Sequence, residues 1–300
     1  MCKIFIIIFD LQATFPGSLF YLTYVKQKGC SISLFYTMRN ICIIAGLAII
    51  ACCTSCSRYY YKPNGVNTPI LSDKGQAELA GSVELGDESR CSNVQAGWSP
   101  ANHIGIIADF SHFVHRENSP VPSAGNVAAT AGLGEIGLGY YYASGDAKRS
   151  LVLDVYAGPG LGYLNSDVNV RFTRYNIQPG IALRTRYLEL ALNIRFSDMF
   201  YYNLSSNGLG DPYLIQQNLV VPGGRGITDG GYLFCEPAFT IRGGYKLVKL
   251  QLQWVNAQAM SHTAWNYETG QINFGIIFRL EEWRQLFHKG KYIGSPDQRD

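Results

Sequence analysis

The chain has few charged residues and few cysteines, and its main apolar run is short. Charged residues make up 16% of the sequence, and 25 Lys and Arg stand against 22 Asp and Glu. This balance excludes the strongly basic surface on which nucleic-acid binding depends, so we expect no nucleic-acid partner. The apolar run at residues 41–51 is shorter than the roughly 20 residues of a transmembrane helix.

Glycine and aromatic residues, by contrast, are abundant. The chain has 32 Gly and 20 Tyr, and aromatic residues make up 13% of it. Aromatic side chains favour strands, and glycine suits turns and close backbone contacts. The composition therefore favours an ordered β protein over a disordered chain.

The region from Met38 has the features of a secretory signal. Arg39 supplies a positive charge, residues 41–51 are apolar, and small residues follow, which is the order found in a signal peptide. We predict that residues 38–55 are the signal peptide. Residues 1–37 would place this signal in mid-chain, so we interpret them as an upstream mis-start that is not part of the fold.

The end of this signal resembles that of bacterial lipoproteins, in which the first mature residue is an acylated cysteine. Cys56 lies between two serines and is followed by tyrosines at 59–61, and aromatic rings favour the membrane interface. The resemblance implies lipidation of Cys56, membrane lipid as a partner and an N-terminal tether at residues 56–73. Cys52 and Cys53 are competing sites, and an ordinary secretory signal without lipid is the alternative.

Cleavage would leave few of the 8 cysteines. Cys56, Cys91 and Cys235 are too few for a disulfide framework. If Cys56 is acylated, Cys91 and Cys235 could pair in an oxidising compartment or remain separate thiols, and the sequence does not decide between these. Cleavage would also remove four basic residues and one acidic residue, which leaves 21 of each sign and a neutral mature chain.

Ten segments of the mature chain alternate apolar and polar side chains with a period of two residues. In the segment at 188–196, Leu188, Leu190 and Leu192 occupy one face and Glu189 the other. This period is typical of β-strands that stand between two unlike environments, here lipid and a polar lumen. The predicted strands cover residues 77–85, 93–98, 104–111, 135–142, 151–161, 175–184, 188–196, 233–242, 248–254 and 272–279.

The connections between these strands alternate in length. Short ones lie at residues 99–103, 144–149, 184–186 and 243–244, and long ones at 115–130, 203–230 and 259–269. Outer-membrane barrels have short turns on the periplasmic rim and long loops on the other, and an even strand number returns both termini to the periplasm. We predict an all-β fold, a closed antiparallel up-and-down transmembrane β-barrel of about ten strands over residues 74–280. Residues 281–300 would form a periplasmic tail with a short helix.

These patterns resemble the small outer-membrane β-barrels of the OmpA/OmpX type over most of residues 74–280. The resemblance implies an outer-membrane protein of a Gram-negative cell envelope. It implies little chemistry, because it rests on alternation and loop lengths rather than on fixed residues. The chain departs from that family at its end, since Phe278 is followed by a tail where the family usually ends on an aromatic residue recognised during assembly.

The polar faces carry charges of both signs, with acidic residues mainly in the first strands and basic residues in the last. Inside a narrow barrel an unpaired charge is costly, whereas a paired network is tolerated. We predict a lumen charge network made of Glu78, Asp109, Glu135, Asp154, Glu189, Arg195, Glu236, Arg242, Lys249 and Arg279. The network would plug the lumen, and a narrow passive pore is the alternative, although a barrel of about ten strands holds little beyond its own side chains.

Aromatic residues gather near the predicted strand ends, where the girdles of a membrane barrel lie. The candidates are Tyr140, Tyr141, Tyr142, Phe196, Phe200, Tyr201, Tyr202, Trp254 and Trp265. A soluble lipocalin-like carrier of an apolar ligand would show the same alternation with its apolar face turned inward. Glycines on the polar face, the signal peptide and the unequal rims favour the membrane.

The sequence has no arrangement typical of an active site. Ser111 and His112 are neighbours in a predicted strand, so they point to opposite faces and cannot form the hydrogen bond of a nucleophile and its base. No His and Cys spacing indicates a metal site. We expect no enzyme activity and no cofactor, with an outer-membrane lipid-modifying enzyme as the alternative. The expected role is structural or surface interaction, with an extracellular partner at the long loops.

Overall fold

A computed structural model describes residues 59–85, 89–116, 128–145, 149–245 and 247–280. The predicted mis-start, signal peptide, Cys56 and C-terminal tail lie outside these ranges. All described residues belong to one compact unit of the chain. Within them, no helix combines the length and the apolar character needed to cross a bilayer.

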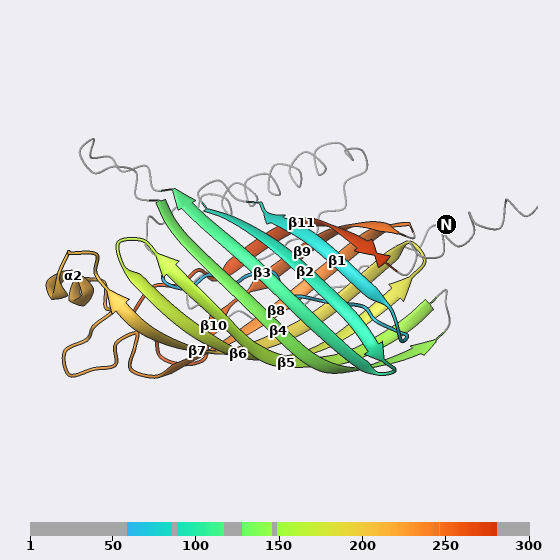
Figure 1. Ribbon diagram of the computed structural model, residues 1–300, viewed down its shortest axis with the longest axis horizontal. Coiled ribbons are helices and arrows are strands. Elements are labelled where there is room, and N and C mark those ends of the chain that lie inside the picture. The colour runs from blue at the N-terminus through green and yellow to red at the C-terminus, as the bar shows by residue number, and fades with distance from the viewer. Residues whose placement is uncertain (1–58, 86–88, 117–127, 146–148, 246, 281–300) are drawn as a thin grey trace, which may run out of the picture. The chain divides into compact units, whose positions relative to one another are not determined.

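The described chain consists mainly of long β-strands (Figure 1). The strands are β1 (Ala77–Glu84), β2 (Ser89–Ala101), β3 (Ile104–Arg116), β4 (Ala128–Gly145), β5 (Arg149–Asn165), β6 (Asn169–Thr185), β7 (Leu188–Ser205), β8 (Gly231–Tyr245), β9 (Val248–Asn256), β10 (Gln258–Ala259) and β11 (Gly270–Arg279). One short helix, α2 (Asp211–Gln216), lies between β7 and β8.

Ten of these strands form a closed barrel. Each strand from β1 to β8 pairs with the next one in antiparallel fashion. β9 then pairs with β11, and β11 pairs with β1, which closes the sheet. The two-residue β10 pairs with β8. The predicted fold class, a closed up-and-down antiparallel β-barrel, is therefore confirmed.

Side chains of the barrel wall alternate between the outside and the lumen. On β9, Leu250 is 50% exposed and Lys249 only 2%, and on β11 Phe274 is 42% exposed. On β7, Glu189 is 1% exposed. The apolar faces therefore point outward and the charged residues point inward, which is the reverse of the arrangement in a lipocalin-like carrier.

The girdle prediction is wrong for three aromatic residues. Tyr141, Tyr201 and Trp265 are 1%, 4% and 3% exposed, respectively. Consecutive strand residues point to opposite faces, so Tyr141 enters the barrel while Tyr140 and Tyr142 stay outside, each 51% exposed. Trp265 lies in the connection between β10 and β11, where its ring is buried among other aromatic side chains.

Strand β6 begins earlier than predicted, at Asn169 rather than near Tyr175. In the first residues of this strand, Phe172 and Arg174 point to the inner face, and they are 8% and 0% exposed. The sequence pattern concealed this stretch because an apolar and a charged residue share the same face. The only register shift between β6 and β7 in the described pairing lies between Asn169 and Arg171.

The connections define two ends of the barrel. Turns of two or three residues join β2 to β3, β4 to β5, β6 to β7 and β8 to β9 at one end, which we call the short-turn end. The other connections, including the one that carries α2, lie at the opposite, long-loop end (Figure 1). This distribution agrees with the short turns and long loops predicted from the sequence, except that only residues 166–168 join β5 to β6 at the long-loop end.

Residues 60–71, predicted as part of an external tether, run inside the barrel, and we call them the lumen segment. At the long-loop end, the Tyr60 N–H donates to the Asn266 carbonyl (3.0 Å), and at the short-turn end the Gly75 N–H donates to the Ser99 carbonyl (2.7 Å). Between these points the segment is buried apart from a half-buried Lys62. Figure 1 shows it as the blue chain that passes lengthwise through the barrel.

The described chain therefore enters the barrel at the long-loop end, whereas β11 ends at the short-turn end, where the Arg279 N–H donates to the Leu247 carbonyl (2.9 Å). Glu78 near the start of β1 and Arg279 at the end of β11 face each other, so both ends of the predicted barrel domain lie at the short-turn end. The expectation that the chain upstream of the barrel also lies on that side does not hold for Tyr60. That expectation counted strands only, and the lumen segment adds one further pass through the barrel.

We expect Gly97→Val to destabilise the barrel, because a Cβ at Gly97 would lie 2.5 Å from the Pro69 Cβ of the lumen segment. Overpacking of this kind costs about 1 to 3 kcal/mol. Gly81→Val is the matched control, since Gly81 is exposed on β1 and an added Cβ meets nothing within 4 Å. The measurement is the midpoint of urea unfolding in detergent. Equal effects of the two substitutions would contradict the close packing of segment and wall.

Candidate functional site

The lumen segment is held through its backbone by side chains of the barrel wall. The Val66 N–H donates to Gln253 Oε1 (2.9 Å), and the Val66 carbonyl accepts from Gln253 Nε2 (2.8 Å). The Gly65 N–H donates to Asn93 Oδ1 (3.4 Å), and its carbonyl accepts from Gln95 Nε2 (3.0 Å). Buried backbone groups need partners. Inward amides of β2 and β9 supply them in place of a neighbouring strand.

Further contacts continue along the segment toward the short-turn end. Gln178 Nε2 donates to the Asn67 carbonyl (2.6 Å), and Asn67 Nδ2 donates to the Ala96 carbonyl (2.9 Å). Thr68 Oγ1 accepts from Arg242 (2.8 Å). The lumen is therefore a polar groove that binds an extended, uncharged stretch of its own chain.

A first charge cluster surrounds Asn64. Arg174 donates to Glu135 Oε1 (2.8 Å) and to Asn64 Oδ1 (2.8 Å). Arg195 donates to the same Asn64 oxygen (2.9 Å) and pairs with Glu236. Two cations and two carboxylates thus lie together in the interior, and mutual pairing compensates the cost of burying them.

A second charge cluster lies toward the short-turn end, around Glu189. This carboxylate accepts from Lys249 (2.7 Å) and from Arg279. Arg242 lies 3.2 Å from Glu78 and 3.8 Å from Glu189, and Arg279 lies 3.2 Å from Glu78. Barrel closure is essential here, because it places Glu78 on β1 directly opposite Arg279 on β11.

All ten residues proposed for the lumen charge network lie on the inner face of the wall. Eight of them belong to these two clusters. The other two, Asp109 and Asp154, also point inward, but neither forms an ion pair with another residue that the structure describes. The charges therefore form two separate groups, each linked to a different part of the lumen segment.

Sequence reasoning missed Arg174 and Asn64, which are both 0% exposed. Arg174 falls before the predicted start of its strand, although it continues the inward phase of Gln178. Asn64 lies in the stretch interpreted as a tether. The available signal was composition, because residues 63–72 carry no charge, whereas a solvated tether usually contains charged residues.

Apolar contacts anchor the segment at both ends. At the short-turn end, Ile70 and Leu71 are 1% and 0% exposed and pack in one cluster with Tyr141 and Val152. At the long-loop end, the Tyr61 ring stacks on Phe234 with centroids 4.1 Å apart. Burying such side chains contributes about 1.5 to 3 kcal/mol each, so the segment is an integral part of the folded barrel.

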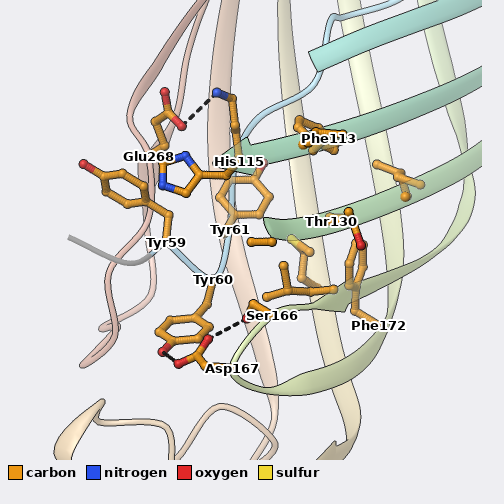
Figure 2. Close-up of a pocket in the computed structure, with 18 of the residues that line it drawn as sticks. Tyr59, Tyr60, Tyr61, Phe113, His115, Thr130, Ser166, Asp167, Phe172 and Glu268 are labelled. Carbon is orange, nitrogen blue, oxygen red and sulfur yellow. Dashed lines mark hydrogen bonds and ion pairs between the residues drawn. The ribbon is translucent and has the colours of Figure 1, made fainter. Parts of the chain in front are cut away.

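A cavity of about 110 Å³ lies beside the segment at the long-loop end. Its walls are mainly apolar, with Phe113 and Phe172 among them, as Figure 2 shows. At its edge, Lys62 pairs with Glu268 (3.0 Å) and also with Glu84 (2.6 Å). The cavity is a candidate site for a small apolar molecule. Several of its polar groups are already bonded, since Tyr60 and Ser166 both donate to Asp167 (3.5 and 2.6 Å).

The remaining reactive side chains do not form a site. Cys91 faces the lumen from β2 and Cys235 lies half-buried on the outer face of β8, and both are free thiols, which decides the open question of a disulfide. His112 points outward on β3, and His115 lines the cavity. In the part of the chain that the structure describes, no group of His, Cys, Asp or Glu could hold a metal ion.

Comparisons with known proteins assign no family. No family model matches the chain, and no curated protein does. Among solved structures, the chain is similar to CdiB from Acinetobacter baumannii, with 8% sequence identity and a TM-score of 0.21. The similarity covers 68% of this chain and 59% of that chain, so the chain spans less than two thirds of the length of its match. A likeness at this level supports no functional conclusion.

Proposed function

We propose that the protein is a β-barrel of the Gram-negative outer membrane, anchored by a lipid on Cys56 and closed by its own lumen segment, with a structural or surface-interaction role. The observation that carries the proposal is the combination of an apolar outer wall with a charged, filled interior. In water, such a wall would expose a large apolar area, which is energetically costly. Lipid around the wall covers this area and removes the cost.

The long apolar rows on the outer face support a location in lipid. On β5, Leu151, Leu153 and Leu161 are 42%, 46% and 64% exposed. On β4, Ile136 and Leu138 are 58% and 62% exposed. A soluble monomer rarely exposes continuous apolar surface of this extent.

The filled lumen favours a closed barrel over a passive pore. The lumen segment occupies the interior, and Val66, Leu71 and Asn64 on it are all 0% exposed. An open pore needs a continuous water path, which a buried peptide with bonded backbone groups prevents. The solute-conducting alternative would therefore require the segment to leave.

Non-enzymatic function is the simplest proposal for the described side chains. The outward His112 lies opposite Ser92 on β2, but a nucleophile and base would also need an orienting group. The long-loop end, with α2 and the exposed Leu209 and Met260 (53% and 60%), offers a surface for an extracellular partner.

Fractionation tests this proposal. We expect the wild-type protein to stay in membranes washed with carbonate, to migrate faster on gels before heating than after it, and to incorporate labelled palmitate. The Cys56→Ala variant should lose the palmitate label and keep the heat-dependent mobility, because the anchor is not part of the barrel. Label that persists in Cys56→Ala would move the anchor to Cys52 or Cys53. Recovery of the wild-type protein in the aqueous fraction would contradict the membrane location.

A further inference from the structure

The lumen segment has a fixed direction through the barrel. Lys62 pairs with Glu84, the last residue of β1, at the long-loop end. Ten residues later in the chain, Ser72 Oγ accepts from Arg184 (3.2 Å) at the short-turn end. The chain then turns back into β1. Tyr59 therefore lies at the long-loop end, where it lines the cavity in Figure 2.

This direction is held by interactions that sliding of the segment would break. Lys62 is paired with two carboxylates, Asn64 is bonded to two buried arginines, and Thr68 is bonded to Arg242. The contacts lie at three successive levels of the lumen. A shift by one residue would move Lys62 away from Glu84 and Glu268, and it would take Asn64 and Thr68 away from the buried arginines that bind them. Each lost hydrogen bond to a buried charged group is costly.

The residues upstream of Tyr59 are joined covalently to the long-loop end. Cys56 is three residues upstream, so it lies within about 11 Å of Tyr59 even in a fully extended chain. The apolar band of an outer-membrane barrel is about 25 Å tall. A lipid on Cys56 therefore cannot reach the leaflet at the short-turn end.

We propose that the protein passes its own N-terminus through the barrel and displays it at the cell surface, with the lipid on Cys56 inserted in the outer leaflet. This inference rests on the proposed outer-membrane location with the short turns toward the periplasm. The partner of the N-terminus is the lipid surface of the outer leaflet next to the long loops. The barrel is then a conduit that was assembled around a segment of its own chain.

Single-cysteine labelling tests the inference in the full-length protein. The background carries Cys91→Ser and Cys235→Ser, and its own labelling gives the baseline from the remaining native cysteines. Tyr59→Cys reports the start of the lumen segment. Lys74→Cys, exposed just beyond the other end of the segment, is the matched control, and Gln216→Cys, exposed on α2, marks the long-loop end. Intact cells are treated with a membrane-impermeant maleimide, before and after permeabilisation of the outer membrane.

We expect Tyr59→Cys and Gln216→Cys to label on intact cells at least about ten times above the baseline, and Lys74→Cys only after permeabilisation. Labelling of Gln216→Cys without Tyr59→Cys would overturn surface display and leave the proposed outer-membrane location intact. Labelling of Lys74→Cys alone on intact cells would overturn the proposed orientation, and with it the inference. Heat-dependent gel mobility of each variant verifies that the barrel has folded.

Discussion

Deletion of residues 59–71 is expected to turn a non-conducting barrel into a conducting one. The segment fills the lumen, and its removal leaves an inner wall of amides and charges that water can solvate. In planar bilayers the wild-type protein should give no channel steps, and the deletion variant should give discrete ones. The same deletion should lower stability, because five apolar side chains that are at most 5% exposed are lost: Tyr60, Tyr61, Val66, Ile70 and Leu71.

A deletion of equal length elsewhere is the control. Removing residues 211–223 shortens the connection between β7 and β8 by the same 13 residues and leaves the lumen segment in place. This variant should remain non-conducting, because Val66, Ile70 and Leu71 of the lumen segment still fill the barrel. It should lose some stability, because Leu214 and Leu219 pack in the buried cluster that contains Tyr60 and Tyr61. A folded 59–71 deletion that conducts no better than wild type would show that the segment does not close the lumen.

Glu135→Gln is expected to destabilise the barrel by about 3 to 5 kcal/mol, the cost of leaving a buried charge without its partner. Arg174 is 0% exposed. It would lose its only carboxylate partner among the described residues and keep the Asn64 side chain. The change also removes the charge that lies 3.9 Å from Arg195. Urea unfolding in detergent measures the loss.

The double variant Glu135→Gln/Arg174→Gln should recover a large part of this loss, because removing both charges avoids an unpaired ion. Arg171→Gln is the matched control, since Arg171 lies on the same strand but is exposed on the outer face. It should change stability by less than about 0.5 kcal/mol. Additive effects of the two lumen substitutions would indicate that Glu135 and Arg174 do not depend on each other.

Of the two partners in this ion pair, the sequence predicted the inward position of Glu135 but not that of Arg174. Glu135 stands in a clear alternation with Ile136 and Leu138, so its inward position followed from the two-residue period. Its partner Arg174 belongs to a stretch of β6 where the period mixes Phe172 and a charge on one face. The contact between Glu135 and Arg174 also crosses β5, where Gly160 lies opposite both residues. The register of three strands sets this contact, and no single strand encodes it.

The sequence by itself determined the class of the fold, the approximate positions of the ten barrel strands and the face to which most wall residues point, because a period of two is a local property of the chain. The start of β6 and the inward Tyr141 and Tyr201 are the exceptions. Only the tertiary structure decided which charges meet, since Glu78 contacts Arg279 through the closure of β1 against β11. It also decided that residues 60–71 fill the lumen. The hydrogen-bond partners of their backbone come from strands far apart in the chain, such as Asn93 on β2 and Gln253 on β9. A local sequence pattern does not predict such long-range hydrogen bonds.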